Sequence, residues 1–169
     1  MKIVNKAPVP NNGGKRQKAV THIVLHIMDG TLAGTDTWFA NRVASASAHY
    51  GVGKNGEIHR YVPDDEVAWH AGRVSEPVAT LPWGNPNQWS IGIEHEGFGT
   101  DTELPFELYM ASAQLLKYLA DKHNVPLDEQ HVLLHREIYS KKTCPGALDR
   151  ALLLRLAKLP FTTDVTEEA

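Results

Sequence analysis

The sequence predicts a single domain of the α/β class, and three observations lead to this prediction. The chain has 169 residues, which is the length of one ordinary domain. Apolar residues make up 42% of the chain and charged residues 22%, so we expect a sizeable core and neither disorder nor a bilayer-spanning segment. Short apolar segments rich in β-branched residues are interspersed with amphipathic ones, so strands and helices share the domain.

The first two elements follow from composition and alternation. Residues 1–20 hold prolines and an Asn/Gly cluster, and we expect them to form an extended N-terminal arm or entry loop. Residues 21–28 are apolar and predict a buried strand with His22 and His26 on the same face. His26 lies at the carboxyl end of this strand, where open α/β sheets place their sites.

The other elements follow from periodicity and turn signals. In order, we expect a helix from Thr35 or Asp36 through Val43, a hairpin over 49–62 turned by Lys54-Asn55-Gly56, a long surface loop over 74–90, a strand over 90–97, an amphipathic helix from Pro105 to His123, a strand over 131–135 and a closing helix over 148–159. The domain is expected to span 21–159, and 160–169 to be a flexible tail.

The charge balance excludes some classes of partner. With 17 Lys+Arg against 20 Asp+Glu, the net charge of −3 argues against a general electrostatic grip on nucleic acid. The basic cluster of Lys15, Arg16 and Lys18 is expected to be a solvated loop. We therefore expect neither a nucleic-acid nor a membrane partner, and we expect a monomer.

The single cysteine and the nine histidines indicate metal chemistry. Cys144 cannot form an internal disulfide, so it is inert, a metal ligand or a nucleophile. His135 precedes it across a turn-rich loop that can bring both side chains to one point, and His26 ends a separate strand. Catalytic zinc takes three such ligands and keeps a fourth position for water. A core histidine at position 135 and a small buried cysteine at 144 fit the same spacing.

Six short segments carry a family resemblance. They are the strand ending at His26, Ser47-Ala48-His49-Tyr50 with Asn55-Gly56-Glu57-Ile58, Ala68-Trp69-His70-Ala71-Gly72, Ser90-Ile91-Gly92-Ile93-Glu94, His135, and Lys142-Thr143-Cys144-Pro145-Gly146. Over about residues 20–158, the chain resembles the zinc-dependent N-acetylmuramoyl-L-alanine amidases of the type-2 amidase family, which are related to T7 lysozyme and the peptidoglycan recognition proteins.

The resemblance implies both a fold and an activity. The fold is a mixed central β-sheet flanked by α-helices, with Zn²⁺ held by His26, His135 and Cys144. The activity is hydrolysis of the amide bond between N-acetylmuramic acid and L-alanine in peptidoglycan or muropeptides, in which zinc-activated water attacks the lactyl carbonyl. Some relatives have Asp where this chain has Cys144.

Further residues are assigned to catalysis and to the substrate groove. Glu94 is the candidate general base, with Glu96 on the same strand face as the fallback. Lys142 would put an ammonium group near the developing oxyanion. His70 matches the Trp-His-Ala-Gly histidine of the family and is assigned to the substrate groove on that resemblance. His49 is assigned there too, although holding a ligand's geometry fits it equally well. Because stem peptides carry carboxylates and sugar faces stack on indole rings, Arg73, Trp83, Asn87 and Trp89 are also expected to line the groove.

Other functions and several cellular settings stay open. A non-catalytic peptidoglycan-binding module is one alternative, although such members typically lose the ligand at Cys144. A thiol hydrolase with Cys144 as nucleophile and His135 as base is another. The N-terminal residues 1–6 lack the apolar stretch of a classical export signal, so we expect a cytoplasmic recycling enzyme, a phage endolysin released through a holin or an effector delivered by dedicated secretion.

Overall fold

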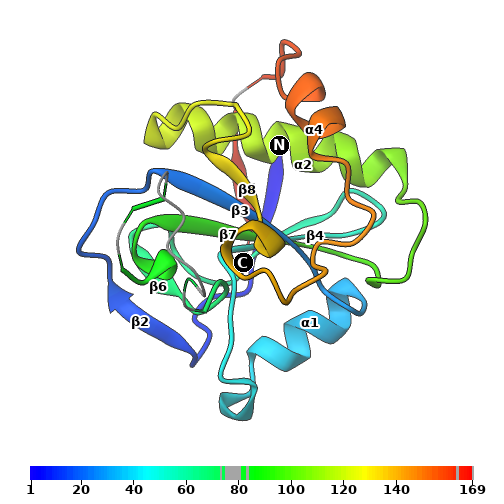
Figure 1. Ribbon diagram of the computed structural model, residues 1–169. Helices are drawn as coiled ribbons and strands as arrows, with labels where there is room; N and C mark the ends of the chain where they lie inside the picture. Colours follow the sequence, from blue (N-terminus) through cyan, green and yellow to red (C-terminus); the bar gives the residue numbers. More distant parts are fainter. Residues whose placement is uncertain (73, 75–80, 83, 163, 169) are drawn as a thin grey trace.

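The computed structural model describes residues 1–72, 74, 81–82, 84–162 and 164–168, and it has a seven-stranded sheet at its centre (Figure 1). The strand order is β8-β3-β7-β4-β5-β1-β9. In that order the strands are Val132–Leu134, His22–Ile27, Ser90–His95, Tyr50–Val52, Ile58–Arg60, Lys2–Asn5 and Thr166–Glu168. All neighbouring pairs are parallel except the hairpin of β4 and β5, so the sheet is mixed, as the family resemblance implies.

Helices lie on both sides of this sheet. α2 (Phe106–His123) and α4 (Arg150–Leu156) pack against each other above the sheet in Figure 1, and α1 (Leu32–Phe39) lies below it. The remaining elements are α3 (His135–Ile138), the 3-10 turns η1 (Arg42–Ala44) and η2 (Pro86–Gln88), and a separate two-stranded sheet of β2 (Asn12–Lys15) and β6 (Glu66–Ala68). This arrangement confirms the predicted single-domain α/β class.

The two faces of the central sheet differ in composition. The face toward α2 is mostly apolar, and its buried side chains include Ile23, Leu25, Ile91 and Ile93 of the strands with Leu108, Leu115, Leu116 and Leu119 of the helix. Each such side chain contributes roughly 1.5–3 kcal/mol on burial, so this face supplies much of the stability. The opposite face carries the alternate residues, and the parallel register sets His26 of β3 beside Glu94 of β7.

The long helix agrees with its periodicity, whereas α1 begins earlier than predicted. Asn124 caps the carboxyl end of α2, and its φ of 55° is a left-handed conformation that asparagine tolerates. Thr31, and neither Thr35 nor Asp36, caps α1, because its hydroxyl oxygen accepts a backbone hydrogen bond of 3.1 Å from the first turn. α1 also ends before Val43, which lies in η1.

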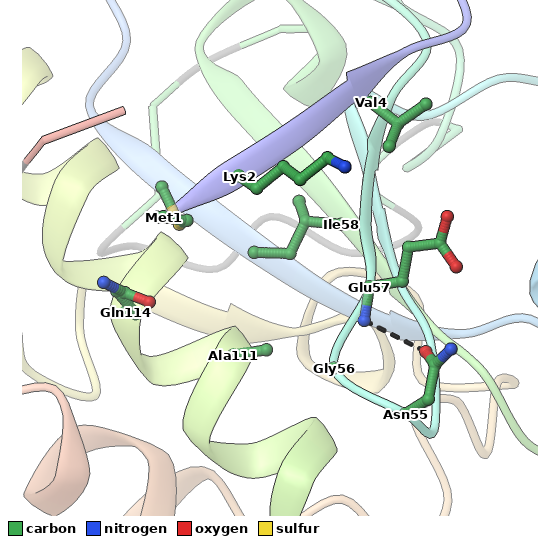
Figure 2. Close-up of a pocket in the computed structure, with 9 residues that line it drawn as sticks. All are labelled: Met1, Lys2, Val4, Asn55, Gly56, Glu57, Ile58, Ala111 and Gln114. Atoms are coloured by element: carbon green, nitrogen blue, oxygen red, sulfur yellow. Dashed lines mark hydrogen bonds between the residues drawn. The ribbon is translucent and has the colours of Figure 1, made fainter. Parts of the chain in front are cut away.

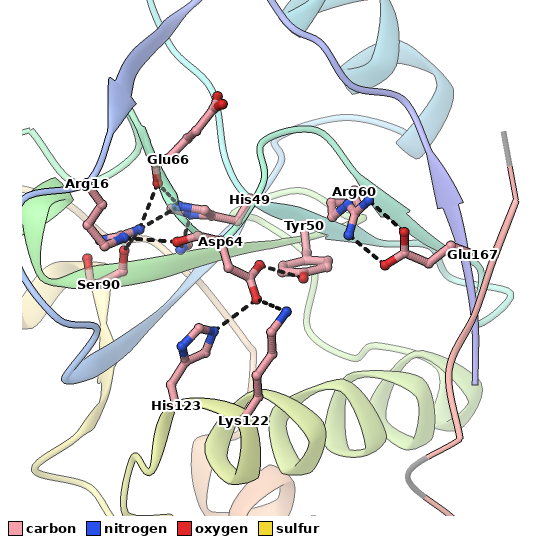
Figure 3. A network of polar contacts seen from close by, with 11 residues as sticks. Arg16, His49, Tyr50, Arg60, Asp64, Glu66, Ser90, Lys122, His123 and Glu167 are labelled. Carbon is pink, nitrogen blue, oxygen red and sulfur yellow. Dashed lines mark hydrogen bonds and ion pairs between the residues drawn. The ribbon is translucent and has the colours of Figure 1, made fainter.

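Both ends of the chain join the sheet, which corrects the expectation of an arm and a flexible tail. β1 lies between β5 and β9, so the first strand of the chain pairs directly with the last. Arg60 of β5 forms a two-pronged ion pair with Glu167 of β9, with N–O distances of 2.6 and 2.7 Å (Figure 3). These partners are far apart in the sequence, and patterning within a few residues carries no signal of them.

Arg16 was expected in a solvated loop, but its guanidinium group is partly buried among backbone carbonyls (Figure 3). It donates hydrogen bonds of 2.9–3.2 Å to the carbonyl oxygens of Asp64, Glu66, Asn87, Gln88 and Ser90. Guanidinium offers five N–H donors in a rigid fork, so a single side chain can join several segments. Arg16 thus links β6 and the residues just before it to the turn that leads into β7.

A hollow of about 360 Å³ lies between β1, the hairpin turn and α2 (Figure 2). Met1, Gly56, Ile58, Ala111 and Gln114 are among the residues around it.

Within the described part of the chain, the one group of three His, Cys, Asp or Glu side chains close enough to share a metal ion lies away from this hollow. Among these same residues, no helix is both long and apolar enough to cross a membrane.

Candidate metal centre

Three neighbouring parallel strands bring the candidate ligands together. β8, β3 and β7 lie side by side, so their carboxyl ends meet at one edge of the sheet, which is where open α/β sheets bind ligands. His26 lies near the end of β3, and His135 directly follows β8. Cys144 lies in the loop after α3 and reaches the same point.

The donor atoms of these three residues form a compact cluster. One donor atom from each of His26, His135 and Cys144 lies within 4.8 Å of the other two. Nδ1 of His26 is 3.1 Å from Nδ1 of His135 and 3.9 Å from Sγ of Cys144. Both histidines are buried and the cysteine is half-buried. The structure therefore brings together the three residues that the sequence singled out as ligands.

Backbone hydrogen bonds hold Cys144 in this cluster. The N–H of Ile27 donates to Sγ at 3.2 Å, and the N–H of Arg136 donates to the Cys144 carbonyl at 3.0 Å, which closes the loop after α3. Burial raises the pKa of the Cys144 thiol to about 12, and the nearby Glu94 carboxylate adds to this rise. A thiol in this environment ionises only when a cation stabilises the thiolate.

Both histidines of the cluster are held in the neutral form. Burial lowers the pKa of His26 well below its usual value, and the adjacent rings of His70 and His135 add to the effect. Burial also lowers the pKa of His135 to about 4, with Lys142 contributing. Neutral imidazole is the form that ligates metals. These shifts are opposite to those of the thiolate–imidazolium pair that a thiol hydrolase needs.

The carboxylate of Glu94, the predicted base, lies beside the cluster. Its position on β7 is in register with His26 on β3, so the two side chains leave the same face of the sheet. Oε2 of Glu94 is buried and has no hydrogen-bond partner among the described residues. Burial, reinforced by the charge of Asp29, raises the pKa of Glu94 to about 8. A carboxylate with a free lone pair and a pKa near neutrality is suited to accept a proton from water.

A cleft of about 700 Å³ opens over the cluster. Glu94, Lys142 and His70 line it together with the three clustered side chains. Asp29 and Phe98 also line it, and neither belongs to the motifs that predicted the site. Asp29 lies just beyond β3, and its place at the carboxyl end of the strand that carries His26 is the signal that identifies it.

His70 lies between the cluster and β7. Its Nδ1 is 3.0 Å from Nε2 of His26, and its Nε2 is 3.2 Å from Oγ of Ser90. Burial lowers the pKa of His70 well below its usual value, and the nearby ring of His49 is the next cause. The residue contacts both a candidate ligand and the cleft.

His49 and Asn87 were expected to line the groove, but both are buried behind it. Nδ1 of His49 accepts a hydrogen bond of 3.0 Å from the N–H of Gly92 on β7. Oδ1 of Asn87 accepts hydrogen bonds from the backbone N–H groups of His70, at 3.1 Å, and Ala71, at 2.8 Å. Both polar side chains therefore support the segments that form the site, and neither reaches the cleft.

The remaining groove predictions have different outcomes. Trp89 is 1% exposed and packs against Val24 and Leu133, so it belongs to the core beneath the site. Arg73 and Trp83 lie outside the described residues. The interpretation of Trp89 as a sugar platform was wrong because an indole with this many apolar neighbours is more stable when it is buried.

Comparisons with known proteins bear on this arrangement. The family model described as N-acetylmuramoyl-L-alanine amidase matches residues 16–147. The chain is 34% identical over 105 residues to N-acetylmuramoyl-L-alanine amidase A of Achromobacter lyticus, covering 61% of this chain and 52% of that protein. It is 31% identical over 133 residues to N-acetylmuramoyl-L-alanine amidase XlyA of Bacillus subtilis (strain 168), covering 75% of this chain and 40% of that protein. A crystal structure of an AmpD derivative superposes with a TM-score of 0.76 at 26% identity, covering 91% of this chain and 93% of that one.

Fold and site define an α/β domain with three candidate metal donors at the carboxyl edge of its sheet. The chain belongs to the N-acetylmuramoyl-L-alanine amidase family, since the family model matches most of its length. This confirms the family that the ordered motifs indicated. The chain spans 52% and 40% of the two curated relatives, which is about half of their length or less.

Proposed function

We propose that this chain is a zinc-dependent hydrolase that cleaves the amide bond between the lactyl group of N-acetylmuramic acid and L-alanine in peptidoglycan or muropeptides. The observation that carries the proposal is the placement of a neutral-imidazole and thiol cluster beside the unpaired carboxylate oxygen of Glu94. Family membership supports the same activity. The open cleft over these groups leaves room for a substrate.

The residues of the cluster fit zinc. Two nitrogens and one sulfur are a common zinc donor set, and tetrahedral bonds of ordinary length would separate two nitrogens by roughly 3.3 Å and a nitrogen from a sulfur by roughly 3.6 Å. The corresponding distances here are 3.1 and 3.9 Å. His26, His135 and Cys144 would therefore hold the ion with little movement. When bound, zinc supplies Lewis acidity, which lowers the pKa of water and polarises a carbonyl group.

The protein's own side chains would move the protons. Glu94 accepts a proton from the attacking water as the carbon–oxygen bond forms at the lactyl carbonyl. The same carboxyl group then delivers that proton to the amide nitrogen as the carbon–nitrogen bond breaks, which releases the free amino group of L-alanine. Lys142 lines the cleft and contributes a positive charge close to the developing oxyanion.

The first experiment combines metal analysis with an amidase assay. The wild type is expected to copurify with about one zinc ion per chain and to release L-alanine-headed peptides from purified sacculi. Tight zinc binding without release would favour a non-catalytic binding module. Activity that survives a chelator but is lost on thiol alkylation would overturn the zinc mechanism.

Variants of the cysteine ligand give this experiment a matched control. Cys144→Ser is expected to lose zinc, because a hydroxyl group is a poor substitute for thiolate. Cys144→Asp is expected to retain more zinc, since a carboxylate is a competent ligand. Equal zinc occupancy in the wild type and both variants would place the third ligand elsewhere.

A comparison of sacculi with soluble anhydro-muropeptides in the same amidase assay then separates a lytic from a recycling substrate preference.

A further inference from the structure

We infer that Ser90 and His70 are positioning residues that fix which ring nitrogen of the histidine ligand His26 carries a proton, so that Nδ1 of His26 faces the metal. The inference deepens the proposed zinc site and rests on it. It assigns to His70 a role toward His26 in addition to its place in the wall of the cleft.

The first step is the proton of the Ser90 hydroxyl group. Oγ of Ser90 lies 2.7 Å from the carbonyl oxygen of Pro86, which can only accept, so the single hydroxyl proton is used there. The same Oγ lies 3.2 Å from Nε2 of His70 and must accept from it. Nε2 of His70 therefore carries a proton.

The second step shows which nitrogen of the ligand His26 carries a proton. Among the described residues, the polar and ring–ring contacts of the His70 ring are with Ser90, His26 and His49, and no carboxylate is among them to stabilise a charge. A neutral His70 ring with its proton on Nε2 accepts through Nδ1, and Nε2 of His26 lies 3.0 Å away as the donor. The lone pair of His26 is then on Nδ1, which points to the cluster.

The distance between the two histidine ligands agrees with this assignment. Nδ1 of His26 and Nδ1 of His135 are 3.1 Å apart, and two lone pairs at this distance repel each other unless a cation lies between them.

His70 is itself held by residues of η2 and β7. Oδ1 of Asn87 accepts hydrogen bonds from the backbone N–H groups of His70 and Ala71. Gly92 leaves room for the imidazole ring, because a Cβ atom at that position would lie 2.4 Å from Cγ of His70. Asn87, Ser90 and Gly92 precede the base Glu94 along one short segment, so this segment supports the ligand His26 as well as supplying the base.

The test compares two buried serines that each bond a histidine ring. Ser90→Ala removes the proposed acceptor, whereas Ser112→Ala removes a hydroxyl group 2.7 Å from Nε2 of His95, on the opposite face of the sheet. Zinc affinity is measured by competition with a chromogenic chelator. Ring proton positions are read from long-range ¹H–¹⁵N NMR spectra of the zinc-loaded proteins.

The wild type is expected to carry a proton on Nε2 of both His26 and His70. Ser90→Ala is expected to lose the defined proton position on His70 and to bind zinc roughly 10-fold more weakly, while Ser112→Ala keeps both. A wild-type His70 with its proton on Nδ1, or a Ser90→Ala protein with unchanged proton positions and zinc affinity, would overturn the inference.

A second pair of variants keeps the test decisive if Ser90→Ala does not fold. His70→Asn retains an acceptor near the position of Nδ1 and is expected to bind zinc more tightly than His70→Ala. Equal zinc affinities of the two variants would contradict the inference. Neither readout uses a substrate, so a protein that shows the expected proton positions but cleaves no peptidoglycan would overturn the proposed function alone.

Discussion

Two buried carboxylates, Asp64 and Glu94, are placed in opposite environments. Oδ1 of Asp64 accepts a hydrogen bond of 2.6 Å from the hydroxyl of Tyr50, and Oδ2 lies 2.8 Å from Nζ of Lys122 and 2.9 Å from Nε2 of His123 (Figure 3). Oε2 of Glu94 is also buried, but it has no partner among the described residues. One carboxylate is fully engaged and the other keeps a free lone pair.

The pKa values of the Asp64 and Glu94 carboxyl groups differ accordingly. Burial alone would raise the pKa of Asp64, but hydrogen bonds from His123, Lys122 and Tyr50 outweigh it and hold the pKa well below its usual value. Burial raises the pKa of Glu94 to about 8 because nothing compensates it. Neighbours, and not burial, therefore decide whether a buried carboxylate stabilises the fold or stays available for proton transfer.

The largest expected effect is on catalysis. Glu94→Gln should lower the rate of muropeptide hydrolysis by roughly 10²–10⁴-fold, because the amide cannot accept the proton of water. Zinc content should stay normal, and stability should not fall, since the variant removes a buried carboxyl group that lacks a partner. Enzyme assay, metal analysis and urea unfolding check these three expectations.

Glu96→Gln is the matched control for this variant. Oε2 of Glu96 accepts a hydrogen bond of 2.7 Å from the backbone N–H of Lys54, so this side chain serves the hairpin turn. Its turnover should remain close to that of the wild type. If Glu96→Gln lost activity and Glu94→Gln kept it, the assignment of the base would have to be exchanged between the two residues.

The second effect is on stability. Asp64→Asn should lower the free energy of unfolding by about 2 kcal/mol, because the amide cannot satisfy the donors of Lys122 and His123. The loss is no larger because the Lys122 ammonium is partly exposed, and water solvates it when its partner is removed. Chemical denaturation measures this loss. The folded fraction should retain its zinc and its activity, since Asp64 lies away from the cleft. An activity loss larger than the loss of folded protein would contradict the separation of the two carboxylates.

The smallest effect is the dependence of stability on pH. Because the pKa of Asp64 is lower in the folded than in the unfolded chain, the unfolded state binds the proton first and stability falls as pH drops below about 4. The contribution lost by pH 3 is about 1 kcal/mol. Subtracting the unfolding profile of Asp64→Asn from that of the wild type isolates it. A difference that does not change between pH 6 and pH 3 would show that Asp64 is not held ionised.

Sequence patterns predicted those features that depend on local spacing. The periodicity of residues 105–123 predicted α2, and alternation predicted that His22 and His26 share one face of their strand and that Glu94 and Glu96 share one face of theirs. The resemblance in ordered motifs predicted the ligand set of His26, His135 and Cys144, which the structure brings within 4.8 Å. Each of these follows from the regular repeat of helix or strand, or from a motif that is contiguous in the chain.

Sequence patterns did not predict the features that depend on distant partners. Arg16 looked like a surface cation because its carbonyl partners lie on other segments. His49 and Asn87 looked like groove residues because polarity alone does not show which side of a segment faces the cleft. β1 and β9 looked like an arm and a tail because their pairing depends on residues at the other end of the chain.

The sequence by itself thus determined the class of fold, the family and the chemical identity of the candidate metal-binding and proton-accepting groups, because residue type, ordered motifs and short-range periodicity carry that information. Only the tertiary structure decided which polar side chains are satisfied and which remain free. That distinction arises from contacts between strands and loops far apart in the chain, and it makes Glu94 a candidate base while Asp64, equally acidic in sequence, stabilises the fold.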